Sequence, residues 1–120
     1  TRAFSFITDT VEGSVLAMES DSASGNIFHI GSSEEISIEE LIRAVGDMME
    51  FSGEYQDAPT YPGSVSRRCP DISKAKRELG YAPKTNWKDG LKVTVDWYRH
   101  YFSTNGSAPQ DGFKEQEQFS

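Results

Sequence analysis

The 120-residue sequence predicts an α/β fold, in which short buried strands alternate with helices. Two kinds of segment carry this prediction. Phe4–Ile7 and Ile27–Ile30 are short runs rich in β-branched and aromatic residues, which is typical of strands. Between and after them, apolar residues recur every three or four positions, which indicates amphipathic helices. Strands that alternate with helices form parallel sheets, so we expect both strands to be of the parallel type.

The first 30 residues predict a strand, a helix and a second strand. The first strand covers residues 3–8. Asp9 follows as a helix N-cap, with Glu12 as its capping partner, and this helix should end near Ser20. After a polar loop, Ile27–Ile30 is apolar on both faces apart from one histidine, which fits a buried strand.

The clearest local signal is a capping box that starts a helix over residues 38–50. Ser37 stands at the N-cap and Glu40 at the third helical position, where each can satisfy a free backbone N–H of the other. Ile36 and Leu41 have the spacing of a hydrophobic staple across the same helix start.

The second half of the chain predicts two more helices. An edge strand is expected around Tyr55. Asp71 caps a short helix that Gly80 ends, because glycine readily adopts the left-handed conformation at a helix C-terminus. Asn86 caps a last helix that runs to about residue 102. Residues 103–120 are polar and are expected to form a flexible tail.

Composition excludes several classes of protein. No apolar run approaches the roughly 18 residues that span a bilayer, and the start lacks the features of a signal peptide. We therefore expect a cytoplasmic location and no membrane contact. The net charge of −7 argues against nucleic acid as the main partner. One cysteine, Cys69, and two distant histidines exclude a disulfide framework and give no support for a metal site.

The charge is unevenly distributed along the chain. Residues 1–60 hold two basic and twelve acidic residues, whereas residues 61–102 hold nine basic and four acidic ones. The basic excess is suited to an anionic small molecule. The alternative is a solvated face with cations near helix C-termini.

The candidate binding residues are three arginines and two hydroxyl groups of a turn. Arginine forms bidentate bonds to phosphate and keeps its charge at any physiological pH. The alternative is that these arginines are ordinary surface residues. The sequence has no glycine-rich dinucleotide turn and no phosphate-binding loop, so we assign no catalytic, cofactor-binding or metal-binding residue. The substrate-binding candidates are Arg2, Tyr61, Ser64, Arg67 and Arg68.

Three segments in one order resemble a known family. They are TRAFSFITDTVEG (1–13), GNIFHIG followed by EISIEEL (25–41), and RRCPDISKAKRELGYAP (67–83). Together they resemble the C-terminal part of the extended short-chain dehydrogenase/reductase family, the NAD-dependent epimerases, dehydratases and decarboxylases of nucleotide sugars. The likeness is strongest to UDP-glucuronate decarboxylases and nucleotide-hexose 4,6-dehydratases, and it covers residues 1–102.

The resemblance implies a fold and roles for the candidate residues. The fold would be the C-terminal substrate-binding portion of a Rossmann-type enzyme, with two short parallel-type strands and about four helices, over residues 1–102. Arg2 matches the family's arginine that contacts the diphosphate. Arg67 and Arg68 match a basic pair that precedes Pro-Asp-Ile. Three positions depart from the family's pattern: Tyr61 replaces a second arginine, Ser64 replaces an acidic residue, and His29 replaces an asparagine at the end of a strand.

The resemblance also implies what this chain lacks. The family's glycine-rich NAD turn and its catalytic Tyr-x-x-x-Lys lie in an N-terminal Rossmann domain, and neither motif occurs here. We therefore expect a fragment of an enzyme that moves a hydride at sugar C4 and passes through a 4-keto intermediate. NAD would be bound by the complete enzyme and not by this chain alone, which should be inactive. The partners would be a nucleotide sugar, the missing N-terminal domain and further copies in a homo-oligomer. The alternative is a stand-alone noncatalytic module that binds a nucleotide sugar or a protein.

Overall fold

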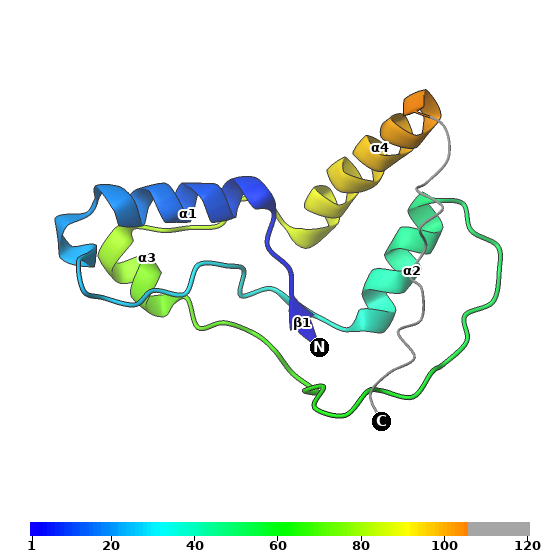
Figure 1. Ribbon diagram of the computed structural model, residues 1–120, viewed down its shortest axis with the longest axis horizontal. Helices are drawn as coiled ribbons and strands as arrows, with labels where there is room; N and C mark the ends of the chain where they lie inside the picture. Colours follow the sequence, from blue (N-terminus) through cyan, green and yellow to red (C-terminus); the bar gives the residue numbers. More distant parts are fainter. Residues whose placement is uncertain (106–120) are drawn as a thin grey trace.

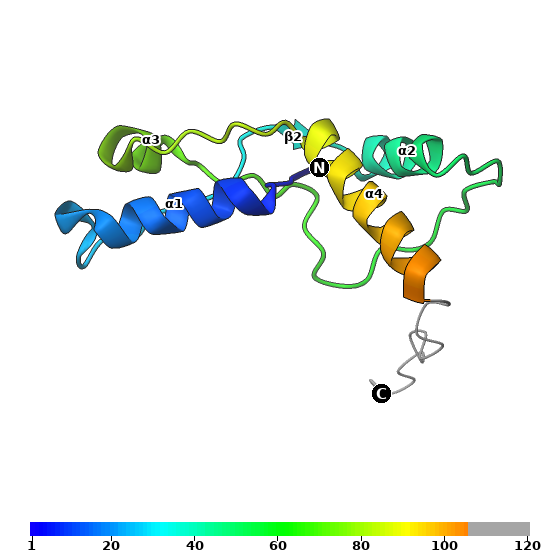
Figure 2. The ribbon, with the colours of Figure 1, turned by 90° about the horizontal axis from the view of Figure 1, so that it is seen from above.

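The computed structural model describes residues 1–105, which form four helices and two short strands (Figure 1). Helices α1 and α3 lie side by side on one side of the strands, and α2 and α4 contact each other on the other side (Figures 1 and 2). In chain order the elements are β1 (Arg2–Ala3), α1 (Ile7–Glu19), the 3-10 turn η1 (Asp21–Ala23), β2 (Glu35–Ile36), α2 (Ile38–Met48), α3 (Ser73–Leu79) and α4 (Trp87–Asn105).

Strand β1 lies between two segments that are distant in the sequence. On one side it pairs antiparallel with β2, with Arg2 opposite Ile36 and Ala3 opposite Glu35. On the other side Arg2 forms a parallel bridge with Arg68. The Ala3 N–H donates to the Arg68 carbonyl at 3.1 Å, and the Arg68 N–H donates to the Thr1 carbonyl at 3.0 Å. Strands β1 and β2 are thus antiparallel to each other, and only the single bridge to Arg68 is parallel among the described residues. The prediction that the two strands are of the parallel type is wrong.

The strand positions also differ from the prediction. Helix α1 begins at Ile7, inside the strand expected over residues 3–8, and only Arg2–Ala3 is extended in a sheet. Ile27–Ile30 is irregular, and Ile27 is 81% exposed. The expected edge strand around Tyr55 is irregular as well. The physical reason is that a strand needs a neighbour for its backbone hydrogen bonds, and residues 1–105 offer none to these runs.

Helix α1 begins without the predicted side-chain cap. Its N-cap is Phe6, and Asp9 lies within the first helical turn. The Asp9 carboxylate is buried and accepts hydrogen bonds from the backbone N–H groups of Lys84 (3.1 Å) and Thr85 (3.0 Å). Glu12 forms an ion pair with the Lys84 ammonium at 2.6 Å. The two carboxylates therefore attach α1 to the segment before α4 instead of capping the helix.

The core lies between α1 and α3. Tyr81 is 1% exposed, and its hydroxyl donates to the Gly31 carbonyl at 2.8 Å. Gly13 of α1 faces this ring so closely that any side chain there would overlap it. The buried apolar residues of this core are Ile72, Ala75, Leu79 and Tyr81, with Leu16, Ala17, Ala23, Phe28 and Ile30 packed against them.

The capping box of α2 is confirmed. The Ser37 hydroxyl accepts from the Glu40 N–H at 3.0 Å, and the Glu40 carboxylate accepts from the Ser37 N–H at 2.7 Å. These bonds satisfy two of the backbone donors that a helix start leaves free. The helix ends at Met48, slightly before the predicted residue 50.

The ends of α3 and the start of α4 follow the sequence signals closely. Gly80 ends α3 in the left-handed conformation, with φ 67°. Asp71 accepts from the Ser73 N–H at 2.9 Å, although the N-cap itself is Ile72. The Asn86 side-chain oxygen accepts from the Asp89 N–H at 2.9 Å, as predicted. Helix α4 continues to Asn105, past the predicted end, and the remainder of the expected tail lies outside the described residues.

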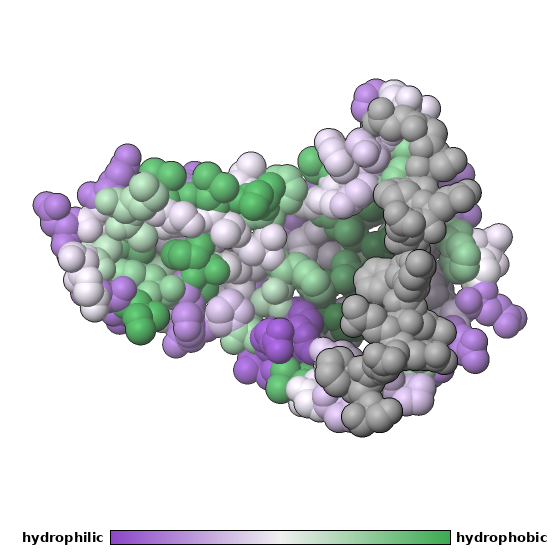
Figure 3. Space-filling view, viewed as in Figure 1, coloured by the Kyte–Doolittle hydropathy of each residue, from purple (hydrophilic) through white to green (hydrophobic). Residues whose placement is uncertain are grey.

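One face of α1 is apolar and exposed. Ile7, Val11, Val15 and Met18 recur along it with helical spacing and are between 43% and 85% exposed. Figure 3 shows hydrophobic side chains gathered over this helix. Among residues 1–105, no helix combines the length and apolarity needed to cross a membrane.

Candidate anion-binding site

The site centres on two arginines that the backbone ladder places opposite each other. Arg2 in β1 and Arg68 in the neighbouring segment are bridge partners. Side chains of directly paired residues lie on the same face of a sheet. Like charges on directly paired positions repel each other where their side chains approach, and an anion bound between them would relieve that repulsion. Within residues 1–105, no carboxylate forms an ion pair with either guanidinium.

The Arg2 side chain is held by backbone oxygens. One terminal nitrogen donates to the Thr1 carbonyl at 2.7 Å, and the other donates to the Val65 carbonyl at 2.9 Å. A guanidinium has five N–H groups, so these two bonds orient Arg2 and leave donors for a ligand. The Arg68 side chain is exposed, and no hydrogen bond to it occurs in the described part of the chain.

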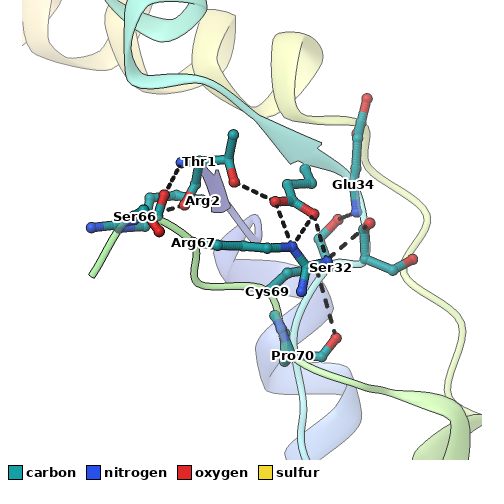
Figure 4. A network of polar contacts seen from close by, with 10 residues as sticks. Thr1, Arg2, Ser32, Glu34, Ser66, Arg67, Cys69 and Pro70 are labelled. Atoms are coloured by element: carbon teal, nitrogen blue, oxygen red, sulfur yellow. Dashed lines mark hydrogen bonds and ion pairs between the residues drawn. The ribbon is translucent and has the colours of Figure 1, made fainter.

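Arg67 is engaged elsewhere. Its Nε and one terminal nitrogen donate to both carboxylate oxygens of Glu35, at 2.8 to 3.1 Å. The Thr1 hydroxyl donates to the same carboxylate. Adjacent residues of an extended segment point to opposite faces, so Arg67 and Arg68 diverge. Figure 4 shows Thr1, Arg2, Ser66 and Arg67 gathered around this network.

The hydrogen bonds of this network shift the pKa of Glu35 and of Arg67. The pKa of Glu35 is lowered, first by the hydrogen bond from the Thr1 hydroxyl and then by the bond from Arg67. The pKa of Arg67 is raised by the hydrogen bond to Glu35 and by the negative charge of that carboxylate. Both groups are therefore ionised at neutral pH, and the positive charge of Arg67 is neutralised locally.

The two hydroxyl candidates lie in the turn before the ladder. The Ser64 N–H donates to the Tyr61 carbonyl at 3.2 Å and closes the turn. Gly63 lies between them with φ 87°, a backbone conformation that would be strained in a residue with a side chain. Tyr61 is 74% exposed, and Ser64 is half-buried. In the described structure no hydrogen bond joins either hydroxyl to the arginines. The structure thus brings the three arginines to one ladder, with Tyr61 and Ser64 in the adjoining turn.

The sequence did not identify Thr1 or Glu35 as members of this network. Glu35 lies 32 residues before Arg67, and no local spacing rule connects residues so far apart. The one available signal was local: Glu35 and Ile36 directly precede the N-cap Ser37 of a helix, which places Glu35 in an extended segment without indicating its partner.

A separate cavity of about 220 Å³ lies between the link from β1 to α1 and the facing sides of α2 and α4. Phe4, Phe6, Leu41, Trp87 and Leu91 line it, and none of its lining residues is charged. An apolar cavity does not stabilise an anion, because burial of a charge without a partner is costly. The arginine ladder is therefore the better anion site.

The described residues do not fit a dinucleotide or a metal. A dinucleotide is held where a glycine-rich turn leads from a strand into a helix N-terminus. The helices begin after Phe6, Ser37, Ile72 and Asn86, and no glycine-rich turn precedes any of these positions. Over the same residues, no cluster of three metal-ligand side chains occurs. We therefore assign none of residues 1–105 to NAD or to a metal.

Comparison with known proteins identifies the family to which this chain is similar. A family model described as GDP-mannose 4,6 dehydratase matches residues 1–94. The UDP-N-acetyl-alpha-D-glucosaminuronate decarboxylase of Bacillus cytotoxicus is 32% identical over 105 residues, which cover 82% of this chain and 32% of the relative. UDP-glucuronic acid decarboxylase 1 of Arabidopsis thaliana is 34% identical over 100 residues, which cover 83% of this chain and 22% of the relative.

Solved structures of nucleotide-sugar epimerases also align with this chain. A UDP-glucose 4-epimerase of Thermotoga maritima, solved with UDP-glucose, aligns with a TM-score of 0.76 and 29% identity over 83% of this chain and 32% of that one. A UDP-glucuronic acid 4-epimerase of Bacillus cereus, solved with UDP-glucuronic acid and NAD, aligns with a TM-score of 0.75 and 29% identity over 82% of this chain and 32% of that one.

The architecture and the matches define the class: the chain belongs to the family of NAD-dependent nucleotide-sugar epimerases, dehydratases and decarboxylases, as a partial match to its members. Within that class, the chain belongs to the GDP-mannose 4,6-dehydratase family. It spans between 22% and 32% of the length of the relatives described above.

Proposed function

We propose that this chain is the substrate-binding part of an enzyme that acts on a nucleotide sugar, and that Arg2 and Arg68 bind the diphosphate. The observation that carries the proposal is the parallel bridge that pairs Arg2 with Arg68 in the backbone ladder, while no carboxylate of residues 1–105 forms an ion pair with either side chain. A bound anion would relieve their mutual repulsion. The solved relatives that contain UDP-glucose or UDP-glucuronic acid support a nucleoside diphosphate as that anion.

The geometry favours a diphosphate over a single phosphate. Neighbouring strands lie about 4.8 Å apart, so the long side chains of arginines on facing positions can reach two linked phosphates. Arg67 is paired with Glu35 and contributes no free fork. The hydroxyls of Tyr61 and Ser64 would supply further donors from the adjoining turn.

We assign the hydride chemistry to polypeptide outside this chain. The described residues do not fit NAD, whereas the Bacillus cereus relative was solved with NAD and extends well beyond the aligned part. In this proposal the 120-residue chain binds and orients the substrate, and an N-terminal Rossmann domain supplies the cofactor site and the catalytic base. The isolated chain should then bind UDP weakly and catalyse no reaction.

The proposal is tested by an NMR titration of the ¹⁵N-labelled chain with UDP. Replacing Arg2 or Arg68 by alanine should weaken UDP binding by about one to two powers of ten, because charge-assisted hydrogen bonds are worth roughly 1.5–3 kcal/mol. Arg2→Lys should recover part of this loss, since lysine keeps the charge but not the fork.

The matched control is Arg43→Ala. Arg43 is an exposed arginine on α2 that pairs with Glu39 at 2.8 Å, away from the ladder. This variant should bind UDP like the unmodified chain. Equal affinity in Arg68→Ala and Arg43→Ala, or no response of the unmodified chain to UDP, would refute the diphosphate site.

A further inference from the structure

Glu35 is an acidic residue on the ladder that carries the site we assign to an anion. It stands in β2 opposite Ala3. Its carboxylate accepts from the Thr1 hydroxyl and from Arg67, so one side chain links β1, β2 and the segment that contains Arg68. The Glu35 side chain is only 25% exposed, whereas that of Arg67 is 66% exposed.

The register of the ladder depends on this link. Strand β1 has only two residues, and few backbone bonds join it to the segment before Cys69. A shift of one residue in the pairing would turn every side chain to the other face of the sheet. In a shifted pairing, Arg67 would replace Arg68 beside Arg2. The ion pair between Glu35 and Arg67 opposes that shift because it holds Arg67 on the far face.

We propose that Glu35 is a positioning residue of the diphosphate site, which acts by holding Arg67 and Thr1 so that Arg68 stands beside Arg2. This inference rests on the proposed function. It assigns Glu35 no contact with the ligand. Its effect on binding passes through Arg67 and through the register of the ladder.

The direction in which Glu35→Gln changes the affinity for UDP distinguishes a positioning role of Glu35 from simple charge repulsion between Glu35 and the ligand. A carboxylate near a polyanion repels it, and its removal also frees the charge of Arg67. Coulomb interactions alone therefore predict that Glu35→Gln binds UDP more tightly. The positioning role predicts the opposite, because the neutral amide holds Arg67 weakly and the two arginines lose their alignment.

The experiment is a UDP titration of Glu35→Gln, Glu35→Asp and Glu39→Gln in the 120-residue chain, followed by NMR. We expect Glu35→Gln to weaken binding on the order of tenfold, the scale of one well-placed charged hydrogen bond. Glu35→Asp keeps the charge and should recover part of the affinity. Glu39→Gln removes the carboxylate of the exposed pair with Arg43 and should leave binding unchanged.

Two further measurements complete the test. Arg67→Ala should weaken binding as Glu35→Gln does, and the double variant should be no weaker than either single one, because both changes break the same link. Glu35→Gln should lower the urea midpoint slightly, because hydrogen bonds lower the pKa of Glu35 in the folded state, but its helical circular dichroism before urea is added should match that of Glu39→Gln, which separates a binding effect from general unfolding.

The outcomes distinguish the two proposals. If Glu35→Gln binds UDP as tightly as the unmodified chain or more tightly, while Arg68→Ala loses binding, the positioning role is wrong and the diphosphate site stands. If the double variant loses the sum of the two single effects, Glu35 does not act through Arg67. If Arg68→Ala has no effect, the proposed function itself fails, and the positioning role fails with it.

Discussion

Replacing Gly13 by alanine should destabilise the protein, although alanine is the better helix former. Gly13 lies in the middle of α1, on the face packed against the core. A Cβ atom at this position would stand 2.5 Å from a methyl carbon of Ile30 and 2.9 Å from the ring of Tyr81. Both distances are shorter than van der Waals contact, so one element must move.

The neighbours have little freedom to move. Tyr81 is 1% exposed, and its hydroxyl is fixed to the Gly31 carbonyl. Overpacking of a core costs about 1–3 kcal/mol, and the better helix propensity of alanine returns up to about 1 kcal/mol. We therefore expect Gly13→Ala to lower the free energy of unfolding by about 1–2 kcal/mol.

The assay is urea unfolding followed by helical circular dichroism, with Gly46→Ala as the matched control. Gly46 is also buried within a helix, but the atom nearest to its added Cβ is the hydroxyl of Tyr55. Tyr55 is 51% exposed, and only a long hydrogen bond of 3.5 Å to the Ile42 carbonyl holds its hydroxyl, so the end of its ring can swing away. Gly46→Ala should therefore match the unmodified chain or exceed it by up to about 1 kcal/mol. A Gly13→Ala chain as stable as the Gly46→Ala chain would show that α1 is not packed against Tyr81 as described.

Three further results are expected. Asp9→Ala should cost about 3 kcal/mol in urea unfolding, because it leaves two backbone donors before α4 without their carboxylate acceptor, and Asp9→Asn should cost less. Stability should be constant from neutral pH to about pH 5 and should fall below about pH 4, because hydrogen bonds lower the pKa of Glu35, Glu40 and Asp71 in the folded state. A carboxylate whose pKa is lowered by folding stabilises the folded state above its unfolded-state pKa, and this stabilisation is lost as the pH falls through the folded-state pKa. A urea midpoint that rises on acidification would contradict this prediction. Finally, light scattering should show self-association through the exposed face of α1, which Val11→Glu should reduce, whereas a monodisperse monomer before mutation would count against it.

The helices were predictable because their signals are local. Ser37 and Glu40 are three residues apart, and the cap that they form depends on nothing else in the chain. Gly80 ends α3 for a similar reason, since its backbone conformation is set at that residue. The prediction that Asp9 caps α1 was wrong. A carboxylate near a helix start can also accept hydrogen bonds from backbone N–H groups that are distant in the sequence, and here those of Lys84 and Thr85 donate to Asp9.

The strands were not predictable from composition. Ile27–Ile30 has the residues of a strand, but a strand exists only where a partner backbone is present. The extended pairing instead falls on Arg2–Ala3 and Glu35–Ile36, two short segments of mixed polarity. For the candidate site, the family resemblance indicated the arginines. Only the three-dimensional pairing separated Arg67, which is bound to Glu35, from Arg68.

The shortness of β1 has a consequence for how the site behaves over time. A two-residue strand held by a few exposed backbone bonds opens at much lower free energy than the core around Tyr81. The amide hydrogens of Ala3 and Arg68 should therefore exchange with solvent rapidly, while those of α3 stay protected. A ligand that binds only the closed ladder adds its binding free energy to the closed state. If the ladder binds a nucleoside diphosphate as proposed, that ligand should lower the exchange rates of these two amides selectively, so that the ladder becomes fully ordered only when it is occupied.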